Sequence, residues 1–133
     1  MRNRPVLTAA DAHKMMAACK AEAQKNKWAV AIAIVDESGA AILLERLDGT
    51  GAIASEVAMG KARTSALTKR PSKFFEDRVK ERPAFVTFPT PGVLFQGGLP
   101  LMHQGECVGA IGVSGVQSHE DEQVAKAGAD SLG

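Results

Sequence analysis

The sequence contains no tyrosine, one tryptophan and five phenylalanines, so it offers few rings on which single-stranded nucleic acid could stack. Its net charge of +1 gives no electrostatic reason to expect a nucleic-acid partner. Two cysteines, Cys19 and Cys107, lie far apart without CxxC or Cys/His spacing, so we expect reduced thiols and no metal site. Apolar runs of membrane-spanning length and signal-peptide features are also missing. We therefore expect a cytoplasmic protein with no membrane partner.

Catalytic signatures are scarce as well. The sequence has no GxGxxG, no Walker motif and no arrangement typical of a catalytic triad. A Gly-Val-Ser-Gly segment ends at Gly115, but it lacks the spacing of a nucleophile elbow. Its serine, Ser114, is better suited to hydrogen-bond a ligand at the point where a strand becomes a loop.

The length of 133 residues predicts one domain over residues 1–133, large enough to form a hydrophobic core without disulfides. Two short apolar runs, Leu99–His103 and Cys107–Val113, flank the polar segment Gln104–Glu106, which predicts a β-hairpin. The second run alternates glycine and alanine with branched residues. Glycine weakens a strand unless a packed helix or a ligand must approach the backbone, and both interpretations stay open here.

The N-terminal half predicts a helix followed by a second hairpin. Thr8 and Asp11 have the spacing of a capping box, and apolar residues then recur at helical intervals over Ala9–Lys25. The continuous apolar run Trp28–Val35 is typical of a central strand, and Ala40–Arg46 is the returning strand after a glycine turn.

The second half is richer in helices. We expect a helix over Ala52–Thr68, a short helix over Lys73–Lys80 capped by Ser72, and a final helix that begins at Ser118. The stretch Pro83–Gly98 holds three prolines, which indicates a packed loop with one edge strand. Alanines recur at every fourth position of the first of these helices and allow close packing on the sheet or on another subunit: Ala54, Ala58, Ala62 and Ala66. Hairpins at both ends favour an α+β fold with an antiparallel sheet.

Charged residues gather after the second strand and on the helix that follows. They are Glu45, Arg46, Asp48, Glu56, Lys61 and Arg63. Arg46 leaves a strand just before a glycine-rich break, where its guanidinium could bind a carboxylate such as a haem propionate. The three histidines, His13, His103 and His119, are candidates for a proton-transfer group or an axial ligand.

Six motifs occur in an order that resembles a known family. They are Val35-Asp36-x-x-Gly39, Glu45 to Gly49, Gly60 to Thr64, Gly97 to Pro100, Gly105 to Gly115, and Asp121-Glu122 leading into Ala125-x-Ala127-Gly128. Together they resemble the GlcG/HbpS family of haem-binding or haem-degrading domains, which is related to the C-terminal domain of PduO-type proteins. The resemblance covers Leu7 to Leu132.

This resemblance implies a profilin-like α-β-α sandwich around a five-stranded antiparallel sheet. It also implies a homo-oligomer, such as a dimer, tetramer or octamer. Family members are associated with haem or corrinoid ligands, and others with small organic acids or the catabolism of aromatic compounds, including a hydroxylaminobenzoate lyase activity. Membership of such a family predicts the fold more firmly than the function.

Our leading hypothesis is an oligomeric protein that binds haem or a related tetrapyrrole. Its pocket would lie between the Arg46–Gly51 break, the following helix and the Pro89–Gly98 loop. Arg46 and Lys61 would hold the ligand carboxylates, and Asp48 and Ser114 are further ligand-binding candidates. The ligand plane would be covered by Phe88, Leu94 and Phe95, and the candidates for an axial or proton-transfer group would be His13 and His103.

Two alternatives stay open. In the first, the same pocket belongs to an enzyme acting on a small aromatic or hydroxy acid, with Glu56 and Lys61 as catalytic residues. In the second, the protein is a structural oligomer whose interface is the row of alanines.

Overall fold

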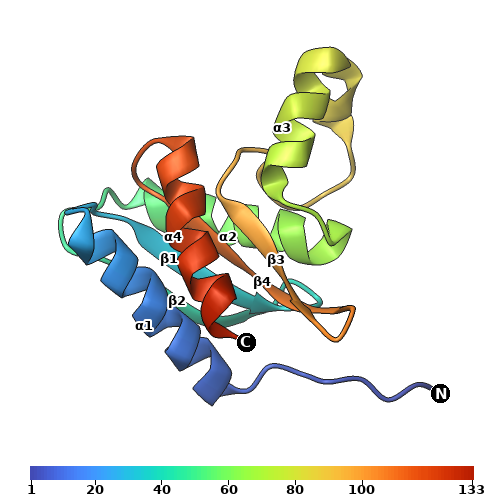
Figure 1. The fold of residues 1–133 in the computed structure, drawn as a ribbon. Coiled ribbons are helices and arrows are strands. Elements are labelled where there is room, and N and C mark those ends of the chain that lie inside the picture. The colour runs from blue at the N-terminus through green and yellow to red at the C-terminus, as the bar shows by residue number, and fades with distance from the viewer.

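The computed structural model describes residues 1–133 and shows one four-stranded antiparallel sheet between two layers of helices (Figure 1). The strands are β1 (Ala31–Asp36), β2 (Ala41–Arg46), β3 (Gly98–His103) and β4 (Glu106–Ser114), in the order β2-β1-β4-β3. The helices are α1 (Ala9–Lys25), α2 (Ile53–Thr68), α3 (Ser72–Glu81) and α4 (Ser118–Ser131), with a short 3₁₀ helix, η1 (Pro83–Thr87). No helix combines the length and the apolar character that crossing a membrane requires.

Both predicted hairpins are present, and so is the predicted first helix. The Thr8 hydroxyl accepts a hydrogen bond from the Asp11 amide at 3.1 Å, and the Asp11 carboxylate accepts one from the Thr8 amide at 2.9 Å. This reciprocal capping box fixes the start of α1. The central strands are β1 and β4, which explains why the sequence of β1 is an unbroken apolar run.

The sheet has four strands, so the predicted fifth strand is wrong. The expected edge strand within Pro83–Gly98 is replaced by η1 and by an irregular segment held against α2. In that segment the Val93 amide donates to the Gly60 carbonyl at 3.0 Å, and Thr64 donates its hydroxyl proton to the Val93 carbonyl at 2.9 Å. Prolines lack the amide hydrogen that a strand ladder needs, and here the segment bonds to a helix instead.

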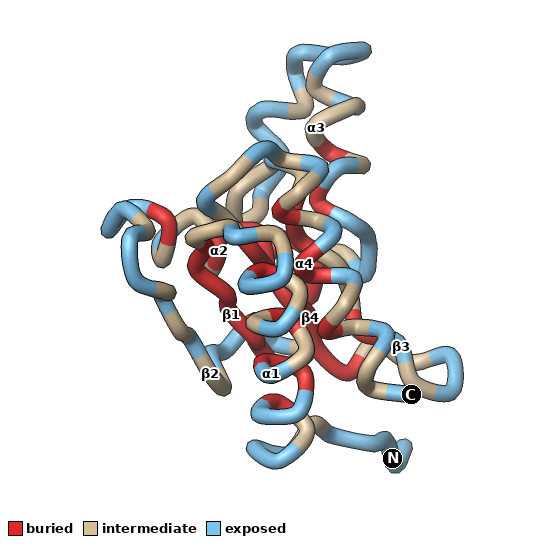
Figure 2. Tube along the Cα trace, turned by 60° about the vertical axis from the view of Figure 1, so that its left-hand side comes forward, coloured by how far each residue is buried: buried red, intermediate tan, exposed pale blue.

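The larger core lies between the sheet and the pair α1 and α4. It contains the side chains that β1 and β4 direct to this face together with the apolar stripe of α1 and part of α4, namely Met15, Met16, Cys19, Ile32, Ile34, Ile111, Val113 and Val124. Figure 2 shows that burial is concentrated in β1, β4 and the helix faces that cover them, whereas the N-terminal segment is mostly exposed and α3 buries only Ser72 and Phe75.

The opposite face of the sheet packs against α2 through small residues. The row of alanines in α2 meets Ala31, Ala33 and Ala110 of the central strands. A Cβ atom at Gly112 would overlap the carbonyl oxygen of Ala58, so the helix backbone rests directly on β4. Of the two interpretations for the alanine row, the structure therefore favours packing on the sheet, and the row is not available as a subunit interface.

The predicted cap of the short helix is also different. Ser72 is the first residue of α3 and makes no capping bond. Its hydroxyl accepts a hydrogen bond from the Gly98 amide at 2.8 Å, so it fixes the start of β3. The α3–η1 unit itself projects from the end of the sandwich (Figure 1).

Candidate functional site

The end of the sheet at which β2 and β4 finish brings two predicted ligand contacts into one row. Arg46 lies opposite Ala31, and Ala31 lies opposite Ser114 on its other side. Paired residues share a face, and neighbouring strands are about 5 Å apart, so Arg46 and Ser114 lie about 10 Å apart on the face that carries α2. Neither side chain has a hydrogen bond or an ion pair within the chain. Both are therefore free to contact a ligand.

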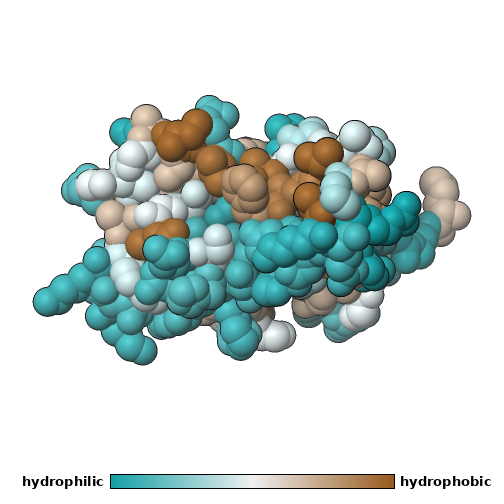
Figure 3. Space-filling model, turned by 90° about the horizontal axis from the view of Figure 1, so that it is seen from above, coloured by the Kyte–Doolittle hydropathy of each residue, from teal (hydrophilic) through white to brown (hydrophobic).

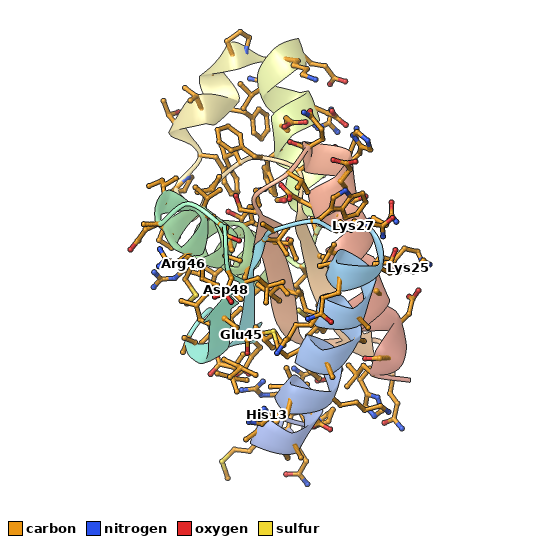
Figure 4. All side chains as sticks on the ribbon, turned by 90° about the vertical axis from the view of Figure 1, so that its left-hand side faces the viewer. His13, Lys25, Lys27, Glu45, Arg46 and Asp48 are labelled. Atoms are coloured by element: carbon orange, nitrogen blue, oxygen red, sulfur yellow. The ribbon has the colours of Figure 1, made fainter.

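A cleft of about 630 Å³ lies between the end of α1 and the end of β2. In Figure 4, Lys27 lies at the end of α1 and Arg46 on the side of α2, at the two sides of this region. We call this cleft the Arg46 cleft; it is lined by Lys20, Gln24, Lys27, Trp28, Ala29, Glu45, Arg46, Leu47 and Asp48. Its volume is within the range of about 300–1,000 Å³ that is usual for small-molecule sites. The one tryptophan of the chain, Trp28, is among these lining residues and also packs against the core.

The charges of the Arg46 cleft favour an anionic ligand. Lys20 and Glu45 neutralise each other across a distance of 2.7 Å. Lys27, Arg46 and Asp48 have no ion pair within the chain, which leaves two free cations and one free carboxylate. An arginine without an internal partner can bind a carboxylate with both arms of its guanidinium group.

Local backbone structure positions these cations. α1 ends at Lys25, and Lys27 then adopts a φ of 59°, in the left-handed region that often terminates helices. The chain therefore turns directly from α1 into β1, which brings Lys27 and Trp28 opposite the end of β2. Sequence reasoning missed both residues, although the boundary between a helix and a buried strand is the signal that could have found them.

Lys61 lies elsewhere, in a buried cluster at the end of β4. Its ammonium donates to the Val113 carbonyl at 2.9 Å and to the Asp121 carboxylate at 3.0 Å, and the two side chains are 3% and 2% exposed. The second oxygen of Asp121 accepts a bond from the Val116 amide at 3.1 Å. Burial raises the pKa of Asp121, and the charge of Lys61 opposes this increase. The ammonium of Lys61 is thus bonded inside the protein.

The proposed catalytic pair is not assembled in this structure. Glu56 is exposed on the outer side of α2, whereas Lys61 points into the protein toward α4. The five-residue spacing places them on different sides of the helix.

The predicted aromatic cover is separate from the Arg46 cleft too. Phe88 packs against Phe75 and Phe85 in the α3–η1 unit, with ring centroids 5.0 Å and 6.0 Å apart. Leu94 is half-buried and Phe95 is 56% exposed in the irregular segment before β3. None of the predicted covering residues lines the cleft that contains Arg46.

The two axial candidates are also outside the Arg46 cleft. His13 is exposed near the start of α1, at the opposite end of that helix from Lys25 (Figure 4). His103 ends β3 at the other end of the sheet, where it lines a hollow of about 210 Å³ together with Leu7, Asp11 and Val108. A single chain therefore does not place a histidine and Arg46 around one cavity.

Comparisons with known proteins agree with this architecture. The family described as "Haem degrading protein HbpS-like" matches residues 7–130. The chain belongs to the HbpS-like family. It is 42% identical over 115 residues to Protein GlcG of Escherichia coli, a match that covers 86% of this chain and 85% of that protein.

Two solved structures show the same fold. A double mutant of HbpS from Streptomyces reticuli has 32% identity and a TM-score of 0.91, covering 100% of this chain and 91% of that one. The PduOC:Heme complex has 25% identity and a TM-score of 0.87, covering 96% of this chain and 95% of that one. The fold and the family are thus established together.

Proposed function

We propose that this protein binds haem or a related tetrapyrrole and that the Arg46 cleft holds the carboxylates of that ligand. The observation that carries the proposal is the pair of free cations, Lys27 and Arg46, in a cleft beside Trp28. Support from outside the chain comes from the haem-degrading family to which it belongs and from the haem complex of a relative with the same fold.

The residues present match one part of a haem and not another. The cations suit the propionates, and the indole of Trp28 suits an apolar ring. An axial histidine is missing from this cleft, because His13 and His103 lie elsewhere on the chain. We therefore infer that the protein is a homo-oligomer, in which a histidine of one subunit reaches the ligand held at the Arg46 cleft of another.

The test is a titration of the purified protein with haemin, followed by the Soret band. We expect saturation at one haem per subunit. Replacing Arg46 or Lys27 with glutamine should weaken binding about tenfold, which is typical of one lost charge-assisted hydrogen bond. The variant K126Q is the matched control, because Lys126 is exposed on α4 and paired with Asp130.

The histidines are tested separately by H13A, H103A and H119A. Loss of the Soret shift in H13A or H103A, with retention in H119A, would support an axial role. Analytical ultracentrifugation of the same samples reports whether haem-binding protein is oligomeric. A featureless titration, or haem binding that is equal in the parent, R46Q and K126Q proteins, would contradict the proposal.

A further inference from the structure

A second groove lies on the α3–η1 unit, and no residue is shared between it and the Arg46 cleft. We call it the Phe88 groove; it has a volume of about 380 Å³ and is lined by Leu67, Thr68, Arg70, Phe74, Phe75, Phe85, Phe88, Pro89 and Thr90. A neighbouring hollow of about 320 Å³ continues it along Arg82, Phe85 and Phe88. In Figure 3, which looks onto this end of the molecule, a band of hydrophobic residues crosses the surface beside a hydrophilic strip.

Four of the five phenylalanines of the chain line the Phe88 groove. Phe75 is 3% exposed and anchors the cluster, whereas Phe88 is 37% exposed. The rings of Phe85 and Phe88 are nearly parallel, with an interplanar angle of 16°, and Phe74 meets Phe75 edge to face at 81°. A planar aromatic molecule can therefore meet both ring faces and ring edges here, which are the two favourable geometries for aromatic pairs.

The charge of the Phe88 groove is positive. Its lining contains no acidic residue. The guanidinium of Arg70 lies 4.3 Å from the centroid of Phe74, and that of Arg82 lies 5.6 Å from the centroid of Phe85. Neither arginine has an ion pair or a side-chain hydrogen bond within the chain. A guanidinium that stacks on a ring keeps its N–H donors in its own plane, where they can bind a carboxylate.

The acidic residues of α3 do not neutralise these arginines. Asp77 pairs with Lys73 at 2.7 Å, and Glu81 pairs with Arg78 at 3.0 Å. Glu76 accepts a hydrogen bond from the Gln96 amide. Two of the three carboxylates of the helix are thus paired with other cations, and the third, Glu76, does not line the groove, so the charged side chains of the lining are all cations.

We propose that the Phe88 groove is a second ligand site, which binds a small aromatic carboxylate of one or two rings. The rings would pack on Phe85 and Phe88, and the carboxylate would accept hydrogen bonds from Arg70. The volume lies near the lower limit for small-molecule sites, which suits one or two fused rings better than a macrocycle. This site is independent of the haem proposal, because it uses different residues at a different place.

The experiment is a titration of the ¹⁵N-labelled full chain with 2-naphthoate, followed by NMR. We expect shifts of the amides between Leu67 and Thr90. The indole N–H of Trp28 serves as an internal reporter of the Arg46 cleft, and we expect it not to move. Naphthalene-2-methanol, which has the same rings without the charge, should bind about tenfold more weakly or worse.

Two variants locate the contacts. R70Q should weaken 2-naphthoate binding at least about tenfold, and F88A should do the same through the loss of a ring contact. R63Q is the matched control, because Arg63 is exposed on α2 and does not line the groove. The dispersion of the remaining amide signals shows that each variant is folded.

Three results would overturn the proposal. The first is equal affinity of the parent, R70Q and R63Q proteins. The second is a shift confined to the Trp28 indole, which would move the ligand to the Arg46 cleft. The third is a concentration-dependent shift of the groove amides without ligand that blocks naphthoate binding, because it would show that a second copy of the chain covers the groove.

Discussion

The buried pair of Lys61 and Asp121 makes a strong prediction about stability. In K61M the Asp121 carboxylate stays buried without its cation. In D121N the buried Lys61 ammonium loses its carboxylate and retains only the hydrogen bond to the Val113 carbonyl. Removing one partner of a buried pair typically costs about 3–5 kcal/mol of the free energy of unfolding. For 133 residues the entropy of unfolding converts each kcal/mol of lost stability into about 3.6 °C, so the melting temperature should fall by about 11–18 °C.

Coupling between the two side chains distinguishes this explanation from a general packing defect. In K61M/D121N the amide oxygen can still accept the Val116 amide hydrogen, and no unpaired buried charge is left. We therefore expect the double variant to lose little more free energy of unfolding than either single variant, with a coupling energy of about 3 kcal/mol. Urea denaturation of all four proteins measures this cycle.

The pH dependence has a defined sign. Loss of Lys61 removes the charge that opposes the burial effect on Asp121, so the pKa of this carboxyl should rise further in K61M. An acid whose pKa is raised on folding binds more protons in the folded state, and stability is then lost as pH rises through the folded pKa. The deficit of K61M should therefore shrink on acidification.

A surface pair provides the control. Lys126 and Asp130 are 68% and 64% exposed and lie 2.6 Å apart. Exposed pairs typically contribute up to about 1 kcal/mol, so K126M should change stability by less than that. The reasoning is refuted if K61M and K126M have similar effects, or if K61M and D121N are additive.

Three further outcomes follow from packing and burial. G112A should lower the free energy of unfolding by at least about 2 kcal/mol because its Cβ would overlap the backbone of α2. The control is G51A, whose Cβ has no atom within 4 Å, and it should change the free energy of unfolding by less than about 0.5 kcal/mol. Urea denaturation compares the two variants. Burial raises the pKa of the Cys19 thiol to about 12, and Cys107 is half-buried, so a disulfide reagent should titrate one thiol in the native protein and two in denaturant. The hydrogen bond from the Thr8 amide lowers the pKa of Asp11 below its usual 3.8. The Asp11 carboxylate therefore stabilises the fold above pH 3.8, and this contribution is lost as pH falls through the folded pKa. Between about pH 5 and pH 2, the urea midpoint of D11N should vary less than that of the parent protein.

Local signals in the sequence were sufficient for most secondary structure. The capping box at Thr8 and the helical apolar stripe gave α1 its correct bounds, and the glycine turn at Gly105 gave the second hairpin. These features depend on residues within a few positions of one another, so no knowledge of tertiary contacts was needed. The fifth strand, which was expected both from the Pro83–Gly98 stretch and from the family resemblance, is absent, because this segment bonds to α2.

The candidate site was harder to predict because contacts between distant segments decide which charged side chains are buried in an ion pair and which stay exposed. Arg46 and Lys61 are both cations near a glycine, so the local sequence predicts the same role for both. In the structure Arg46 is exposed beside a cleft, whereas Lys61 meets a carboxylate sixty positions away in α4. The residues around Lys61 in the sequence do not indicate Asp121 as its partner. Sequence patterns therefore could not distinguish a structural lysine from a ligand-binding one at this position.

The small residues of α2 and β4 connect the structural role of Lys61 with the proposed ligand-binding role of the row that contains Arg46. Because Gly112 lets the helix backbone rest on the strand, Lys61 is close enough to hold the Val113 carbonyl, which directly precedes Ser114. The row that carries Ser114 and Arg46 is therefore fixed by a buried ion pair and by backbone packing. The α3–η1 unit has no buried ion pair and is held by Ser72, by the bond between Glu76 and the Gln96 amide and by its aromatic cluster, so ligand contacts there depend on the rings. A ligand should consequently order the Phe88 groove more than it orders the Arg46 row, and amide hydrogen exchange with and without each ligand measures that difference.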